Sequence, residues 1–87
     1  MTEWPQIESV SFSTDFHIIA RFSNGDQKLF AMAPLLDSEV YKRLNDFEYF
    51  KTGKIRYRDF IEWPNGEDLH KDTLYARGVD IVQAAAA

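Results

Sequence analysis

The ionisable side chains whose spacing could support chemistry gather first around one histidine. Asp68, His70 and Asp72 stand two residues apart, and carboxylates flanking an imidazole can bind a divalent metal. The same pattern at the start of a helix caps the helix and compensates its dipole. Because His17 is the only other histidine and cysteine is absent, the ligand set is sparse. We therefore favour the helix start and expect no metal, cofactor or catalytic residue.

Other motifs of catalysis are missing from the sequence. There is no glycine-rich phosphate loop, no nucleophile elbow and no recognisable spaced pair of carboxylates. We expect a protein that is not an enzyme and has no small-molecule substrate. A small metal-dependent enzyme centred on His70 and Asp68 is the remote alternative.

Positive charge is concentrated in one stretch, residues 49–58, which has no acidic residue and contains Lys51, Lys54, Arg56 and Arg58. On a strand, the last three would project from one face, beside aromatic residues, where an acidic protein or a phosphate backbone could bind. The alternative is a solvated face that pairs with Glu or Asp across the sheet. We favour this alternative, because so few cations give weak affinity for nucleic acid.

A third feature is the segment Trp63-Pro64-Asn65-Gly66. An exposed Trp63 could anchor a partner protein, as tryptophan often does at interfaces. A small domain, however, needs its largest apolar side chain inside, and Ile61 and Trp63 share one strand face. We favour the core for Trp63. The candidate partner contacts are Lys54, Arg56, Arg58, Trp63 and Asn65.

Composition limits the class of protein. The chain has 87 residues, a net charge of −4 and no cysteine, so one small domain must be stabilised by packing alone. The acidic balance disfavours unspecific attraction to nucleic acid or anionic lipid. Because the sequence has neither a signal peptide nor an apolar run of about 18 residues, we expect a soluble, cytoplasmic protein.

The first half predicts three strands, over residues 7–12, 16–22 and 27–32. The second of these alternates apolar and polar positions, which is typical of a strand with one buried face. Asn24-Gly25 favours a two-residue type I′ loop, which would set Arg21 opposite Lys28. A longer loop with a bulge at Gly25 or Asp26 would avoid this pair of like charges.

The middle of the chain predicts one amphipathic helix. Leu36, Val40, Leu44 and Phe47 recur at spacings of four, four and three residues, which places them on one stripe. The helix would begin at Pro34, or one turn later at a cap formed by residues 37–38.

The second half predicts another hairpin, formed by residues 54–58 and 60–63, and then a turn at Asn65-Gly66. Asp68 would cap a short helix over residues 69–77 that closes near Gly78. We thus expect an α+β domain, residues 1–78, with one antiparallel sheet of four or five strands (two hairpins), one amphipathic helix across a face and a short C-terminal helix. Residues 79–87 would be an extension, either helical or frayed.

The string from Ile61 to Leu69, IEWPNGEDL, and the following Leu74-Tyr75 resemble the closing signature of a bacterial family, domain of unknown function 2442. Further matches agree in order and extend the resemblance over roughly Ile7 to Tyr75; they are Phe22, Asn24-Gly25, Pro34-Leu35-Leu36, Leu44, Asp46 and Phe50. The chain departs from many relatives at Ala31, where they have an acidic residue. The stretch after Gly78 has no clear counterpart.

This resemblance implies a small α+β domain that occurs alone or joined to a helix-turn-helix DNA-binding domain, which is absent from this sequence. It also implies that the gene of this protein lies beside a second small gene, in an arrangement that looks like a toxin–antitoxin pair. The family offers no established functional residues. We therefore expect a noncatalytic protein-binding module, either self-associating or the small partner in such a pair or in a regulatory pair. Its contact would be an edge strand or the Trp63 turn. Nucleic-acid contact through residues 51–58 is the alternative.

Overall fold

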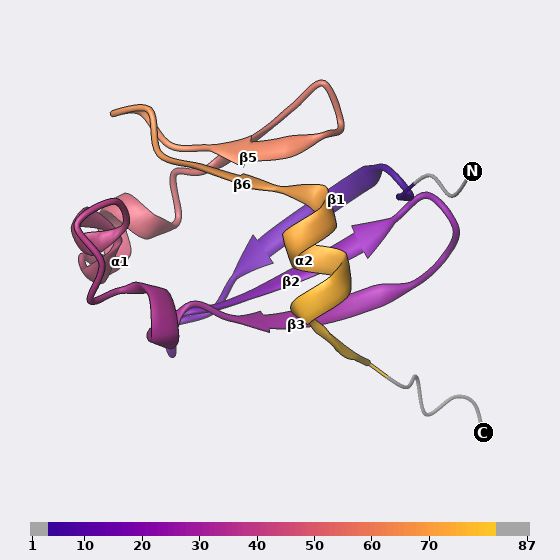
Figure 1. Ribbon diagram of the computed structural model, residues 1–87, viewed down its shortest axis with the longest axis horizontal. Coiled ribbons are helices and arrows are strands. Elements are labelled where there is room, and N and C mark those ends of the chain that lie inside the picture. The colour runs from indigo at the N-terminus through magenta and orange to yellow at the C-terminus, as the bar shows by residue number, and fades with distance from the viewer. Residues whose placement is uncertain (1–3, 82–87) are drawn as a thin grey trace.

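The computed structural model describes residues 4–81, which form an α+β domain with two antiparallel sheets (Figure 1). The first sheet has the strand order β1 (Ile7–Phe12), β2 (His17–Phe22), β3 (Gln27–Ala31) and β7 (Val79–Asp80). The second has the order β4 (Lys54–Arg56), β5 (Phe60–Glu62) and β6 (Asp68–His70). The helical elements are short: η1 (Ala33–Leu35), η2 (Lys42–Asn45), α1 (Phe47–Phe50) and α2 (Lys71–Arg77). The α+β class is confirmed, although the expected single sheet is two.

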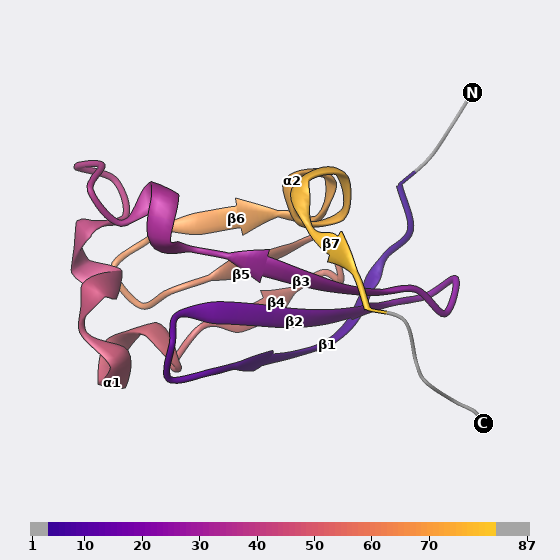
Figure 2. The ribbon, with the colours of Figure 1, turned by 90° about the horizontal axis from the view of Figure 1, so that it is seen from below.

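The two sheets curve around one core. On one side β1 meets the second sheet, where the Ile7 amide donates to the Arg58 carbonyl at 2.8 Å. On the other side α2 contacts both β3 and β6. Figure 2 shows the sheets edge-on, with α1 at the end where β1 turns into β2. There the ring of Phe47 packs edge-on against that of Phe16.

The core confirms the interpretation of Trp63. Its side chain is 1% exposed, and its indole N–H donates to the Phe50 carbonyl at 2.7 Å. The indole stacks on the Phe50 ring at an interplanar angle of 12° and meets the Phe12 ring edge-on. Trp63 thereby joins β1, α1 and the segment that follows β5.

The β2–β3 loop has three residues. The Phe22 amide donates to the Asp26 carbonyl, the Gly25 amide donates to the Phe22 carbonyl, and Gly25 has a φ of 92°. This register places Arg21 opposite Gln27. The two-residue type I′ loop is therefore wrong, and the longer loop, which avoids the pair of Arg21 and Lys28, is confirmed. Glycine suits this position because a side chain at positive φ is strained.

The predicted amphipathic helix over residues 34–47 does not form. Local side-chain hydrogen bonds compete with the helix: the Ser38 hydroxyl donates to the Leu35 carbonyl and accepts from the Tyr41 amide. Asn45 donates its side-chain amide to the Leu36 carbonyl at 2.9 Å. The segment consequently consists of turns and the short 3₁₀ helices η1 and η2. Val40, expected on the buried stripe, is 62% exposed.

The predicted C-terminal helix begins later than expected. Asp68 lies in β6 and caps no helix, because the neighbouring Leu69 is buried and pairs with Ile61 of β5. The helix α2 starts at Lys71. Its expected end is confirmed, since the Gly78 amide donates to a carbonyl of the last turn.

Part of the expected C-terminal extension belongs to the sheet. Val79 and Asp80 form β7 and pair with Leu29 and Lys28 of β3, so they are neither helical nor frayed. The Lys28 ammonium donates to the Asp80 carboxylate at 2.6 Å and lies 4.4 Å from the centre of the Tyr75 ring. The expectation for residues 82–87 lies outside the described residues.

Candidate functional site

The basic stretch is divided between a strand and a turn. Lys54 and Arg56 are exposed on β4, but Tyr57 and Arg58 form the turn that follows, with φ of 53° and 58°. The expectation that Lys54, Arg56 and Arg58 share one strand face is therefore wrong. All three nevertheless remain exposed, as partner contacts require.

Carboxylates lie beside these cations. Arg56 Nε donates to Glu62 Oε1 at 3.0 Å across the second sheet, and an Arg58 nitrogen lies 3.7 Å from Glu8 Oε2. Lys54 is directly opposite Glu62 in the register. The expected pairing with an acidic residue across the sheet is thus present for Arg56. Each such exposed pair stabilises the fold by about 0.2–1 kcal/mol.

The acidic and histidine cluster does not converge on one point. His70 Nε2 lies 3.8 Å from Asp68 Oδ2, both side chains are more than half exposed, and the His70 ring stacks on Phe60. The Asp72 carboxylate instead accepts from the Thr73 amide. Across residues 4–81, no three His, Asp or Glu side chains gather as a metal site. Within the same range, no helix has the length and apolar character needed to cross a bilayer.

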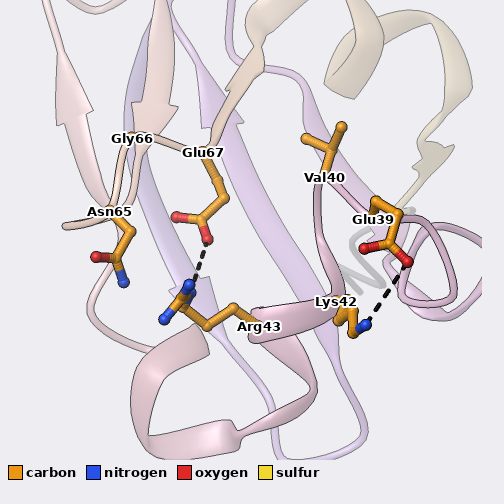
Figure 3. A pocket seen from close by; sticks show the side chains of 7 residues that line it. All are labelled: Glu39, Val40, Lys42, Arg43, Asn65, Gly66 and Glu67. Carbon is orange, nitrogen blue, oxygen red and sulfur yellow. Dashed lines mark ion pairs between the residues drawn. The ribbon is translucent and has the colours of Figure 1, made fainter.

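The Trp63 turn contributes to a surface depression, although Trp63 itself is buried and cannot be an exposed partner contact. The depression has a volume of about 610 Å³ and is open to solvent (Figure 3). We call it the loop hollow. Its lining residues come from the loop around η2 and from the turn after Trp63, and they are Glu39, Val40, Lys42, Arg43, Asn65, Gly66 and Glu67.

The turn side of the loop hollow is held by Tyr49 of α1. The Tyr49 hydroxyl donates to Glu67 Oε1 at 2.7 Å and accepts from the Asn65 amide at 2.8 Å. The Glu67 side chain is only 9% exposed, and Arg43 Nε lies 3.7 Å from its other oxygen. Because one phenol is hydrogen-bonded to both Asn65 and Glu67, the backbone that carries exposed Asn65 is held in place. Gly66, with a φ of 102°, completes the tight turn.

The other side of the loop hollow carries Val40, and Lys42 lies 3.6 Å from Glu39 there. Figure 3 shows Lys42 pointing toward Glu39, and Arg43 reaching across toward Glu67. This side is fixed to the second sheet, because the Tyr41 hydroxyl donates to the Asp68 carbonyl at 2.7 Å. Burial, and then the charge of Asp68, raise the pKa of Tyr41 above its ordinary value.

Sequence reasoning found one member of this site and missed the others. Among the candidate partner contacts, Asn65 alone lines the loop hollow. Val40 was missed because its spacing matched a buried helical stripe. A signal was present in Asp37 and Ser38, which favour turns over helix interiors.

Comparisons with known proteins place the chain in a family. Neither the curated proteins nor the solved structures gave a match. A family model described as a protein of unknown function, DUF2442, matches residues 7–80, from the first residue of β1 to the last residue of β7. The match covers nearly the whole chain, confirms the resemblance seen in the sequence, and shows that the chain belongs to the DUF2442 family.

Proposed function

We propose that this protein is a noncatalytic protein-binding module whose contact surface is the loop hollow. The observation that carries the proposal is Val40, a valine 62% exposed at the edge of a depression. Exposed apolar groups surrounded by polar ones are typical of surfaces that bind proteins. Asn65 adds an exposed amide on a fixed turn.

Two ion pairs line the loop hollow. Lys42 lies beside Glu39, and Arg43 lies beside Glu67. Lys42 and Arg43 are still more than half exposed, so each can turn toward a partner carboxylate. The net charge of −4 would in turn attract a partner that is basic overall.

The resemblance noted in the sequence suggests the kind of partner. We propose the product of the adjacent small gene, in a toxin–antitoxin-like or regulatory pair. A rigid turn and a half-exposed apolar group would give a preorganised contact, which reduces the entropy lost on binding.

The test is coexpression of this chain with a tagged product of the adjacent gene, followed by titration of the purified proteins. We expect a complex of defined stoichiometry that Val40→Asp weakens about tenfold or more, because a carboxylate would have to be desolvated in the contact. The matched control is Val79→Asp, since Val79 is 67% exposed on a different surface. The absence of any complex, or equal effects of the two variants, would refute the proposal.

A further inference from the structure

One carboxylate of the loop hollow is almost buried. The Glu67 side chain is only 9% exposed, whereas the Glu39 side chain, on the other side of the loop hollow, is 89% exposed. Taking a carboxylate out of water is costly unless hydrogen bonds replace the lost hydration. Glu67 therefore gains more from a bound hydrogen-bond donor than Glu39 does.

Only one of the two oxygens of this carboxylate is hydrogen-bonded within the described residues. Oε1 of Glu67 accepts from the Tyr49 hydroxyl at 2.7 Å. Arg43 Nε lies 3.7 Å from Oε2, which is beyond the range of a hydrogen bond. Figure 3 shows the Glu67 carboxylate directed into the loop hollow, with Arg43 reaching toward it from the other side. Oε2 is consequently an open acceptor that faces the loop hollow.

We propose that Oε2 of Glu67 binds an arginine side chain of the partner protein. This inference rests on the proposed function, because the same loop hollow makes the contact. A nearly buried acceptor without a hydrogen bond favours a donor, and a charged donor gives the stronger bond. The net charge of −4 also favours a partner that carries cations.

The carboxylate is prepared for this bond before any partner arrives. A new ion pair usually has to offset the desolvation of both groups. The desolvation of Glu67 occurs on folding instead, since its side chain is already 9% exposed in the free chain. Tyr49 also fixes the carboxylate through Oε1, so little conformational entropy is lost on binding.

The loop hollow suits a guanidinium better than an ammonium. Arg43 shows that a guanidinium can approach Oε2 from the open side. A guanidinium is planar and less strongly hydrated than an ammonium, and it has several N–H donors. Asn65, which lines the same depression, offers its side-chain oxygen to the donors that Glu67 does not use. Val40 offers apolar surface to the carbon chain that carries the guanidinium.

Arg43 competes with a partner arginine for the same oxygen. Its side chain is 63% exposed, so it can leave Glu67 and remain hydrated. Removing it with Arg43→Ala should therefore tighten the binding of an arginine. The matched control is Lys42→Ala, which removes the same charge from the same loop, because Lys42 lies beside Glu39 and not beside Glu67.

An NMR titration of the isotopically labelled full chain with a blocked tripeptide, Val-Arg-Val, tests the proposal. We expect saturable shifts of the Asn65 and Gly66 amides, with a Kd on the order of 1 mM for a single anchored side chain. Glu67→Gln, which keeps an acceptor for the Tyr49 hydroxyl, should weaken binding about tenfold or more. Glu39→Gln makes the same charge change at an exposed position and should weaken it less than about twofold.

Two changes in the probe test the chemistry without altering the protein. Citrulline in place of the arginine keeps the shape but not the charge, and it should abolish the shifts. Lysine should bind several-fold more weakly, and a lysine probe as tight as the arginine probe would overturn the choice of a guanidinium. Unsaturable shifts, a citrulline probe as tight as the arginine probe, or equal effects of Glu67→Gln and Glu39→Gln would overturn the proposal. Circular dichroism checks that each variant is folded.

The same variants separate this proposal from the proposed function. Suppose that Val40→Asp weakens binding of the adjacent gene's product while Glu67→Gln and Glu39→Gln have equal effects. The loop hollow then remains the contact and the arginine anchor is wrong. If the wild type binds no such product, the proposed function fails, and the tripeptide titration decides by itself whether Glu67 binds a guanidinium.

Discussion

Replacing Trp63 by phenylalanine tests the packing that holds the two sheets together. The variant keeps an aromatic ring but removes the N–H that donates to the Phe50 carbonyl at 2.7 Å. Because Trp63 is 1% exposed, no water replaces the lost donor without entering the core. The Phe50 carbonyl then keeps only the long hydrogen bond from the Gly53 amide, at 3.4 Å, and a buried carbonyl left so poorly paired costs about 1–3 kcal/mol. The smaller ring also leaves a void, which costs about 1 kcal/mol for each methyl-sized volume.

The expected total is therefore a loss of about 2–4 kcal/mol in the free energy of unfolding. That is a large share of the roughly 4–13 kcal/mol typical of a domain of this length. Urea unfolding followed by circular dichroism measures it, as a decrease of about 2–4 M in the midpoint if the m-value is near 1 kcal/mol/M.

The matched control is Trp4→Phe, because Trp4 is the other tryptophan and is 43% exposed. We expect this change to stay within about 0.5 kcal/mol. A Trp63→Phe variant as stable as the wild type, or an equal loss of free energy in both variants, would refute this role of Trp63.

Three further changes test other parts of the fold by the same unfolding measurement. A Cβ on Gly53 would lie 2.8 Å from the Trp63 ring, so Gly53→Ala should cost about 1–3 kcal/mol by overpacking; an unchanged midpoint would contradict this. Asp46→Ala should cost about 1 kcal/mol, since the Asp46 carboxylate caps α1, and no loss would show that the cap is unimportant. The hydrogen bond to Asp80 raises the pKa of Lys28 above its ordinary value of 10.5. The folded state therefore favours the protonated amine, and the stabilisation is complete below pH 10.5 and lost as the pH rises through the folded pKa. Between pH 9 and 11.5, the free energy of unfolding should decrease less in Lys28→Met than in the wild type. Equal decreases would contradict the role of the Lys28–Asp80 pair.

The sequence predicted the first hairpin well because its signals are local and agree with one another. Apolar residues alternate through Phe22, and Asn24-Gly25 marks the loop. These local signals did not settle the number of loop residues. A loop of two residues places Arg21 opposite Lys28, whereas the observed register places it opposite Gln27. Trp63 was predictable for another reason, since a small core has few side chains large enough to fill it.

Other parts depended on tertiary contacts that a local pattern does not contain. The strand β6 is three residues long with one buried apolar residue, Leu69, which is too short for an alternating pattern. Val40 had helical spacing, but side-chain hydrogen bonds of Ser38 and Asn45 favoured turns. The positive φ of Tyr57 could not be predicted, because glycine and asparagine are the residues that usually indicate such a conformation. The turns around Val40 form one side of the loop hollow, which was therefore not predictable as a site.

The central functional claim is that Val40 and Asn65 form part of a protein contact. The most direct measurement is a calorimetric titration of the adjacent gene's product into the wild-type chain, Val40→Asp and Val79→Asp. We expect saturable binding to the wild type, an affinity about tenfold or more lower for Val40→Asp, and an unchanged affinity for Val79→Asp. Binding that ignores Val40→Asp, or no binding to the wild type, would contradict it.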